Sequence, residues 1–271
     1  MADLRIGITG CAGRMGQTLI REVAGTAGCR LAAGSERPGH PAVGRDLGTL
    51  AGLAAIGVAV AADAEAVFAS VDAVLDYTAP EASVAHAALA AKTGTALVIG
   101  TTGLTPAHLD AIRAAAARAV IVQSANTSVC VNVLLGIAKK VAAILDPSYD
   151  IEIVEMHHRH KVDAPSGTAL ALGRAVAAGR NVELDRAAVR GRDGITGARA
   201  AGTIGFASLR GGDVVGDHPV VFAAEGERLE LTHKASSRHV FSKGAVRAAL
   251  WSRGQKPGRL YSMADVLGLA D

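Results

Sequence analysis

The sequence predicts an α/β protein that begins with a Rossmann-like domain and continues into an α+β domain. Along the first 128 residues, short apolar runs alternate with helix-like segments, and a glycine-rich turn follows the first run. After residue 202 the runs are short and separated by tight turns. Strands that alternate with helices imply right-handed crossovers and a parallel sheet. Closely spaced strands indicate antiparallel pairing, so we expect the second sheet to be mixed and largely antiparallel.

The expected elements of the first domain follow from apolar runs and capping residues. Thr105-Pro106 is typical of a helix start, because proline suits the first helical position. Residues 40–50 are polar and are expected to form a loop. The strands of the parallel sheet are expected at residues 4–9, 29–33, 71–77, 96–99 and 120–123, with helices at 17–28, 81–92 and 107–119.

Composition excludes several classes of protein. The chain has 271 residues, enough for two modest domains, and a formal net charge of only +3. It has no long run of lysine or arginine, which argues against a nucleic-acid partner. No apolar stretch approaches the roughly 20 residues that span a bilayer, and the first residues lack a signal-peptide layout. Three cysteines without CxxC spacing argue against a disulfide framework. We expect a cytoplasmic protein with no membrane partner.

The turn after the first strand has the spacing G-x-x-G-x-x-G. Such a turn suits a dinucleotide, because glycines allow a tight bend, approach of the pyrophosphate and close helix packing. The spacing alone is weak evidence, since many strand-to-helix turns contain glycine. Twenty residues after Gly16, Glu36 would suit the ribose of NADH and Arg37 the 2′-phosphate of NADPH, although an ordinary charged loop would look the same. The turn residues expected to bind coenzyme are Gly10, Cys11, Ala12, Gly13, Arg14, Met15 and Gly16.

Polar or glycine-containing segments end the later strands of the first domain. In an open parallel sheet, ligands lie beyond the carboxyl ends of the strands. These segments should therefore share one crevice with the glycine turn. The residues expected to bind coenzyme there are Thr78, Gly100, Thr101, Thr102, Ser124, Ala125, Asn126 and Thr127.

The stretch EMHHRHKVDAPSGTAL at residues 155–170 is the densest group of reactive side chains. It follows a strand expected at 150–156 and precedes a helix for which Ser166 is a plausible N-cap. Unpaired amides at a helix start can bind a carboxylate or phosphate. Lys161 would add charge, and a histidine can transfer a proton near neutral pH. The residues would also fit a plain cap, a solvated loop or a metal site, although their spacing matches no known zinc cage.

The string from His157 to Ala169 closely resembles HHxxKxDAPSGTA of the 4-hydroxy-tetrahydrodipicolinate reductase family. GRMG at 13–16, GTTG at 100–103 and residues 232–251 extend the resemblance. It implies NADH- or NADPH-dependent reduction of a cyclic dicarboxylate in diaminopimelate and lysine biosynthesis, without a metal. It also implies His157 as general acid/base and Lys161 as proton donor. The substrate would be bound by His158, Lys161, Ser166, Gly167 and Thr168.

The resemblance also implies the domain organisation and one departure. It implies a dinucleotide-binding domain at residues 1–128, completed by 238–271, and a substrate-binding and tetramerisation domain at 129–237 of a homotetramer. The family commonly has Asn-Phe-Ser and a later glycine where this chain has Thr127 and Cys130. An aromatic ring that would border the nicotinamide is therefore missing.

Parts of the sequence would also fit three other classes of protein. A semialdehyde dehydrogenase needs a thiolate nucleophile, but Cys130 lies in an apolar helical context and is expected to be a packed small side chain. A metal-dependent hydrolase would need no nicotinamide and would lose activity to chelators. A non-catalytic NAD sensor would bind NADH and consume none. Activity of Cys130→Ser would decide the first class, and turnover of NADH or NADPH with substrate separates the other two from a reductase.

Overall fold

The computed structural model describes residues 2–269 and divides the chain into two compact units. The first unit comprises Met1–Val129 and His239–Asp271, and the second comprises Cys130–Arg238. Each unit has its own sheet and its own apolar core. Among residues 2–269, no helix has the length and apolar character needed to cross a bilayer.

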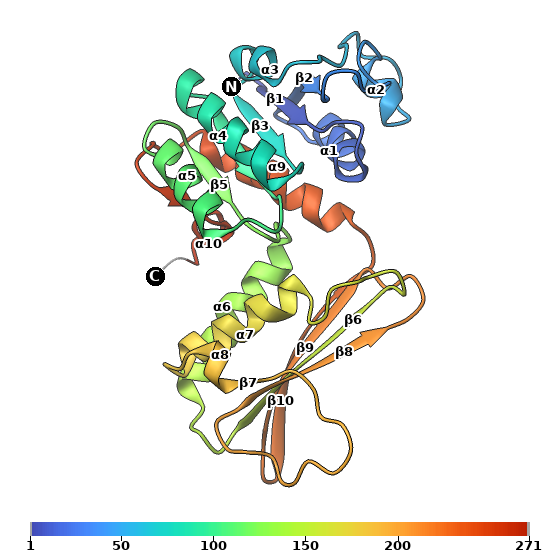
Figure 1. Cartoon of the computed structure of the whole chain (residues 1–271). Coiled ribbons are helices and arrows are strands. Elements are labelled where there is room, and N and C mark those ends of the chain that lie inside the picture. Colours follow the sequence, from blue (N-terminus) through green and yellow to red (C-terminus); the bar gives the residue numbers. More distant parts are fainter. Residues whose placement is uncertain (1, 270–271) are drawn as a thin grey trace. The chain divides into compact units, whose positions relative to one another are not determined.

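The first unit is built on a six-stranded parallel sheet with the order β11-β5-β4-β3-β1-β2 (Figure 1). The prediction of a Rossmann-like parallel sheet is confirmed, and all five expected strands are present. The short edge strand β11 was not expected, because two residues give no recognisable pattern. The strands are β1 (Leu4–Thr9), β2 (Cys29–Ser35), β3 (Ala73–Asp76), β4 (Ala96–Ile99), β5 (Ile121–Gln123) and β11 (Leu260–Tyr261).

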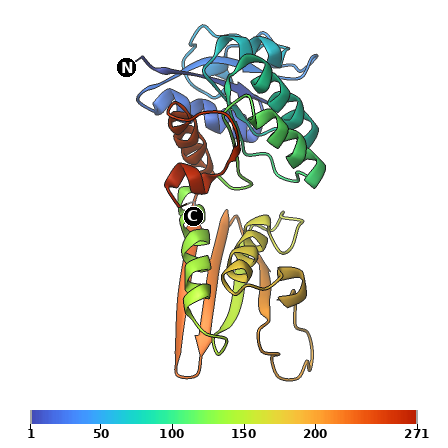
Figure 2. The same cartoon turned by 90° about the vertical axis from the view of Figure 1, so that its left-hand side faces the viewer.

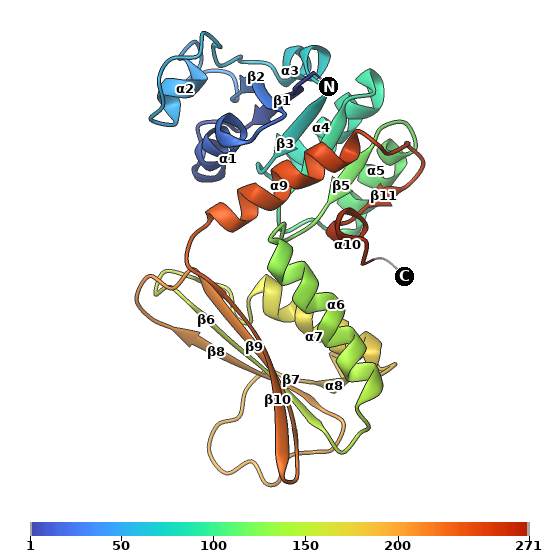
Figure 3. The ribbon, with the colours of Figure 1, turned by 180° about the vertical axis from the view of Figure 1, so that it is seen from behind.

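Helices cover both faces of this sheet. α1 (Arg14–Gly25), α9 (His239–Ser252) and α10 (Met263–Leu267) share one buried cluster with β1, and Figure 3 shows α1 and α9 in front of the sheet. α3 (Ala64–Ser70), α4 (Pro80–Thr93) and α5 (Pro106–Ala116) form the cluster on the other face. Side chains of β3 alternate between the two clusters, with Leu75 in one and Val74 in the other. This alternation places the sheet as the middle layer of a doubly wound unit.

Two local expectations for the first unit have clear outcomes. Thr105 caps α5 as expected, because its hydroxyl accepts from the amide of His108 at 3.3 Å and Pro106 occupies the first turn. The expected loop at 40–50 instead contains the short helix α2 (Leu47–Leu50). Asp46 caps α2 by accepting from the amide of Thr49 at 3.1 Å. Its carboxylate thus stabilises one helical turn within a polar segment.

The second unit contains a mixed five-stranded sheet with the order β10-β9-β6-β8-β7. Figure 2 shows this sheet behind the helices of the unit. β9 pairs antiparallel with β10 and β6, whereas β8 pairs parallel with β6 and β7. The expected mixed sheet is confirmed, and its longest ladder, β9 with β10, is antiparallel. The strands are β6 (Asp150–His157), β7 (Ala188–Val189), β8 (Ile204–Arg210), β9 (Gly216–Ala224) and β10 (Glu227–Ala235).

The helices of the second unit pack on one face of its sheet. α6 (Val129–Ile144) and α7 (Gly167–Gly179) join β6, β8 and β9 in one buried cluster, and α8 (Leu184–Ala187) contributes Leu184. α6 and α7 approach closely at Gly179, where a β-carbon would lie 2.3 Å from the carbonyl oxygen of Lys139. Any side chain at residue 179 would therefore clash with α6, so the close packing of these two helices requires glycine there.

The expectation that Cys130 is a packed small side chain is wrong, because the structure exposes it. The buried residues of α6 are Val131, Leu134, Ala138 and Ala142, which follow the helical spacing of one face. Cys130 precedes the first of these residues and lies outside that face. The position of Cys130 around the helix axis decides its exposure, whereas the apolar character of its sequence neighbours does not.

Candidate functional site

The glycine turn connects β1 to α1 and is closed by its own backbone. Gly10 has φ of 63°, and the amide of Gly13 donates to its carbonyl oxygen at 3.0 Å. A β-carbon at Gly16 would lie 2.3 Å from the Gly10 oxygen, so any larger residue would push the helix away from the turn. Gly13 caps α1 without a side-chain hydrogen bond. The turn thus has the close packing and the helix start that a pyrophosphate group requires.

Glu36 follows β2 and is attached to the same turn. Its Oε1 accepts from the amide of Ala12 at 2.9 Å, and its Oε2 accepts from the amide of Arg37 at 3.3 Å. The carboxylate is half-buried, whereas Arg37 is exposed. The residue expected to face the ribose therefore also fixes the position of the turn, which the sequence pattern did not reveal.

A buried carboxylate organises the ends of β3 and β4. Asp76 is fully buried and accepts from the hydroxyls of Thr78 and Ser83, each at 2.6 Å. The amide of Thr78 donates to the hydroxyl of Thr101 at 3.1 Å. Burial alone would raise the pKa of Asp76, but His86 and the hydroxyl donors outweigh it and lower the pKa. Sequence reasoning missed Asp76, although an aspartate ending a buried strand was a signal.

The segment after β5 is connected to β3 and to α9 by side-chain hydroxyls. The hydroxyl oxygens of Tyr77 and Thr127 are 2.6 Å apart, and the Thr127 hydroxyl donates to the carbonyl oxygen of Phe241 at 2.7 Å. The ring of Tyr77 lies against Gly100, where a β-carbon would overlap it at 2.1 Å. Thr127, which departs from the family pattern, is therefore part of a packed polar contact.

All expected coenzyme residues lie on one edge of the first sheet. They follow the carboxyl ends of β1 to β5 or form the first turn of α1. The hydrogen bonds described above connect Ala12 with Glu36 and Thr78 with Thr101. The residues on this edge are Gly10, Cys11, Ala12, Gly13, Arg14, Met15, Gly16, Glu36, Arg37, Thr78, Gly100, Thr101, Thr102, Ser124, Ala125, Asn126 and Thr127.

The histidine loop begins at the end of β6 in the second unit. Alternation along β6 turns Glu155 and His157 to the buried face, and their exposed fractions are 1% and 8%. His157 Nδ1 lies 2.6 Å from Glu155 Oε2. Burial lowers the pKa of His157, and Glu155 opposes this effect. A buried imidazole beside a carboxylate is suited to proton transfer.

The helix start after this loop is formed as the sequence predicted. Ser166 caps α7, and its hydroxyl accepts from the amide of Ala169 at 3.1 Å. A β-carbon at Gly167 would meet no atom within 4 Å, so packing within the chain does not require glycine there. Thr168 lies in the first turn of α7. Lys161 Nζ is 2.7 Å from Asp163 Oδ1, which neutralises its charge within the loop.

Two histidines that sequence reasoning missed lie beside this loop. His218 of β9 and His233 of β10 face each other across the strand ladder. The ring of His218 is 5.1 Å from that of His157, and its Nε2 is 3.4 Å from the Ser166 hydroxyl oxygen. Burial lowers the pKa of His218 to about 3, so its ring is neutral near pH 7. The pairing register of the strands brings these rings together, and that register cannot be inferred from the sequence around each histidine.

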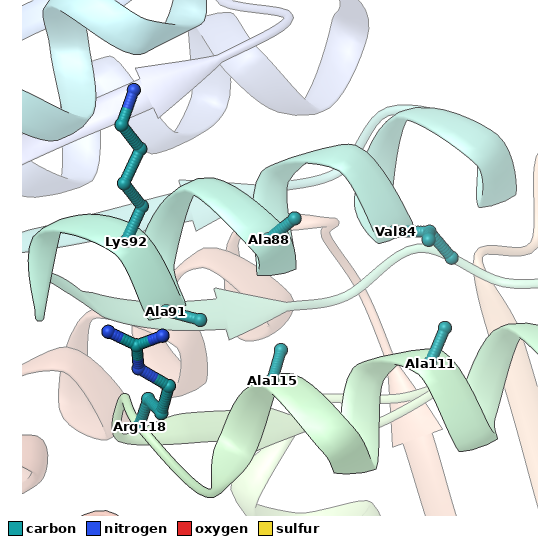
Figure 4. A pocket seen from close by; sticks show the side chains of 7 residues that line it. All are labelled: Val84, Ala88, Ala91, Lys92, Ala111, Ala115 and Arg118. Atoms are coloured by element: carbon teal, nitrogen blue, oxygen red, sulfur yellow. The ribbon is translucent and has the colours of Figure 1, made fainter.

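In the described part of the chain, neither a metal-binding group of side chains nor the cavity between α4 and α5 provides a second candidate site. Within residues 2–269, no group of three or more histidine, cysteine, aspartate or glutamate side chains is arranged to hold a metal ion. A cavity of about 400 Å³ lies between α4 and α5, where alanines such as Ala88 and Ala115 leave space (Figure 4). Lys92 points away from α5 in that view and pairs with Glu65. None of the expected site residues lines this cavity.

Comparison with known proteins gives matches over almost the whole chain. Residues 4–127 match the family described as dihydrodipicolinate reductase, N-terminus, and residues 130–267 match dihydrodipicolinate reductase, C-terminus. A 4-hydroxy-tetrahydrodipicolinate reductase of Rhodopseudomonas palustris strain TIE-1 is 55% identical over 271 residues, covering 100% of both chains. The same enzyme of Dinoroseobacter shibae is 56% identical over 262 residues, covering 97% of both.

Solved structures give a consistent result. The dipicolinate-bound dihydrodipicolinate reductase of Paenisporosarcina sp. TG-14 has a TM-score of 0.78 at 26% identity, covering 97% of this chain and 98% of that one. An amine dehydrogenase of Mycobacterium smegmatis has a TM-score of 0.64 at 15% identity, covering 96% and 95%. The second likeness concerns the fold alone.

Proposed function

Since the chain belongs to the dihydrodipicolinate reductase family, we propose that its glycine turn binds the coenzyme and its histidine loop binds and protonates the substrate. Family membership makes the chain an oxidoreductase of lysine and diaminopimelate biosynthesis with a nicotinamide coenzyme. It reduces 4-hydroxy-tetrahydrodipicolinate to tetrahydrodipicolinate with release of water. The proposal concerns which residues do this work.

The glycine turn and the strand ends fit a dinucleotide. Gly16 keeps α1 close to the turn, and Gly13 begins the helix without a capping side chain that would occupy its amides. When bound, the nicotinamide supplies the hydride. Glu36 would orient the adenosine ribose, and the exposed Arg37 would contact the 2′-phosphate of NADPH. We therefore propose that the enzyme uses both NADH and NADPH.

The substrate carries two carboxylates, and the start of α7 is suited to bind one of them. Ser166, Gly167 and Thr168 form the start of this helix, where the dipole is positive, and the amide of Ser166 is bound to Glu155. Lys161 and His158 would supply further donors from the loop. The observation that supports this assignment most strongly is that the Ser166 amide and His157 bond to the same carboxylate, that of Glu155. A substrate bound at the helix start would thus lie beside His157.

The proton balance of the reaction gives His157 and Lys161 their roles. Loss of water from the hydroxylated carbon and its neighbour leaves a conjugated imine, and hydride then adds to the carbon that carried the hydroxyl. The resulting nitrogen–carbon–carbon unit must gain one proton to give the product imine. Lys161, released from Asp163 by the substrate carboxylates, would donate a proton, and His157 would act as general acid/base. Loss of one such group typically lowers the rate by roughly 10²–10⁴-fold.

The test follows the absorbance of NADH and NADPH after addition of the condensation product of pyruvate and aspartate semialdehyde. We expect His157→Gln and Lys161→Ala to lower kcat by roughly 10²–10⁴-fold while coenzyme affinity stays unchanged. His160→Gln is the matched control, because His160 is exposed on the same loop and outside the proposed set. Near-normal turnover in both loop variants would contradict these assignments.

We also propose that the enzyme is a cytoplasmic homotetramer joined through the sheet of the second unit. The support is that Leu209 of β8 has an exposed fraction of 50% and lies on the sheet face opposite the helices, since Phe206 of the same strand packs against them. β10 is also an edge strand, which proteins tend to cover. Sedimentation of the wild type and a Leu209→Lys variant tests this proposal: a tetramer that persists in the variant would argue against this surface.

A further inference from the structure

We propose that Glu155 is a positioning residue that holds the His157 ring and the start of α7 in one arrangement. The inference rests on the proposed role of His157 and deepens it. No expectation from the sequence assigned a function to Glu155, although it is the first residue of the reactive stretch at 155–170. Its contacts instead make it the centre of the histidine loop.

The buried carboxylate of Glu155 is held by a fork of two hydrogen bonds. Arg210 donates from one guanidinium nitrogen to Oε2 at 2.7 Å and from the other to Oε1 at 2.8 Å. Burial alone would raise the pKa of Glu155, but Arg210 and His157 outweigh it and lower the pKa to about 2. Glu155 is therefore ionised at neutral pH. Because both oxygens are engaged by Arg210, the plane of the carboxylate is fixed.

An ionised carboxylate fixes the proton on one nitrogen of His157. A carboxylate can only accept, so the neutral imidazole must donate from Nδ1 to Glu155. The proton exchanged during catalysis then belongs to Nε2. Gly216 lies close to this atom, and a β-carbon there would crowd Nε2 at 3.0 Å. Glu155 thus selects the tautomer in which the free nitrogen is the one beside glycine.

The same carboxylate connects His157 to the helix that would bind substrate. Glu155 Oε1 accepts from the amide of Ser166 at 3.2 Å, just before the first turn of α7. Arg210 also donates to the carbonyl oxygen of Asp163 at 2.7 Å, which ties the intervening loop to the same group. A shift of the Glu155 carboxylate would therefore move the ring and the helix start together. Proximity effects in catalysis depend on such fixed geometry.

A purely structural role predicts a different outcome, and β6 supplies a matched control. Glu152 lies on the other face of the same strand and is also bound by arginines, with Arg192 donating at 2.9 and 3.0 Å. Its contacts are with the segment around Arg192 and Arg199, not with His157. If Glu155 were only a buried ion pair, its loss would affect stability as the loss of Glu152 does and would leave the chemical step unchanged.

The experiment measures kcat, KM and NADH affinity for Glu155→Gln, Glu152→Gln, His157→Gln and the double variant Glu155→Gln/His157→Gln. We expect Glu155→Gln to lower kcat at least about 10-fold, with the roughly 10²–10⁴-fold loss from a missing acid/base group as the ceiling. Glu152→Gln should keep kcat, and NADH affinity should be unchanged throughout. In the His157→Gln background, Glu155→Gln should lower kcat little further, because its effect on the chemical step acts through His157, whereas an effect through α7 appears in KM.

Two further measurements separate the possible failures. Nitrogen NMR of labelled histidine should show the Nδ1 proton of His157 in the wild type and a changed tautomer in Glu155→Gln. If Glu155→Gln does not fold, Glu155→Gln/Arg210→Met removes the pair without leaving an unpaired buried charge, and the same loss of kcat is expected. Wild-type kcat in Glu155→Gln, or losses that multiply in the double variant, would overturn this inference. A near-normal His157→Gln would instead overturn the proposed role of His157.

Discussion

The hydroxyl contact between Tyr77 and Thr127 can be tested by removing its two hydroxyls singly and together. Thr127 donates its single hydroxyl proton to the Phe241 carbonyl oxygen at 2.7 Å. Tyr77 must therefore be the donor in the 2.6 Å contact between the two hydroxyls. Thr127 is almost completely buried, whereas Tyr77 is half-buried. The order of donors predicts unequal effects for the two single changes.

Thr127→Val keeps the shape of the side chain but leaves the Tyr77 hydroxyl and the Phe241 carbonyl without their partner. A buried group left unpaired costs about 1–3 kcal/mol, and partial burial of Tyr77 suggests about 2 kcal/mol in total. Tyr77→Phe removes only a donor and should cost about 1 kcal/mol. The double variant leaves no unpaired Tyr77 hydroxyl, so we expect about 2 kcal/mol and a coupling energy of about 1 kcal/mol.

The assay is urea unfolding followed by the fluorescence of Trp251, the single tryptophan of the chain. Trp251 lies in α9 of the first unit, so its signal reports the unit that contains the contact. Thr95→Val is the matched control: the Thr95 hydroxyl donates to the Phe68 carbonyl oxygen at 2.7 Å within that unit, and we expect its effect to be additive with Tyr77→Phe. Additivity of Tyr77→Phe and Thr127→Val within about 0.3 kcal/mol would refute the reasoning.

Two further predictions concern coenzyme choice and acid stability. Arg37→Ala should weaken NADPH at least about 10-fold more than NADH in fluorescence titrations, since a hydrogen bond to a charged partner is worth about 1.5–3 kcal/mol; equal losses would mean that Arg37 is only a surface residue. Burial lowers the pKa of His218 from 6.5 to about 3, so the unfolded chain binds the proton more readily and stability is lost as the pH falls below 6.5. Between about pH 8 and about pH 5 this amounts to about 2 kcal/mol. Urea unfolding by circular dichroism should therefore depend less on pH in His218→Gln, and titration of His218 above pH 5 by NMR would contradict the assignment.

The elements that sequence reasoning located are those with a local cause. Each strand from β1 to β5 is an apolar run bounded by glycine or polar residues, and the caps at Thr105 and Ser166 lie next to the helices they begin. The elements that were not predicted either lack such a local cause or had a capping signal that was overlooked. β11 consists of two residues held by pairing with β5. α3, by contrast, had a visible cap at Asp63, whose side chain accepts from the amide of Glu65.

The candidate site divides in the same way. The histidine loop, Ser166 and the glycine turn are contiguous in sequence, so their residue types and spacing could be recognised. Arg210 lies 55 residues from Glu155, and His218 lies 52 residues from Ser166. Their contacts depend on β8 pairing parallel with β6 and on β9 pairing antiparallel with β6. A change of register by one residue would turn either side chain to the opposite face. Sequence spacing carries no information about that choice.

Strand alternation also explains why β6 can contain two carboxylates with different surroundings. Residues at even and odd positions point to opposite faces, so Glu152 and Glu155 are separated although they are three residues apart. Glu152 keeps partial access to water, and its pairing with Arg192 anchors a surface segment. Glu155 has almost no access to water, so its charge requires hydrogen bonds from every side. Because Arg210, His157 and Ser166 supply hydrogen bonds to Glu155, one buried charge connects the ring and the helix start.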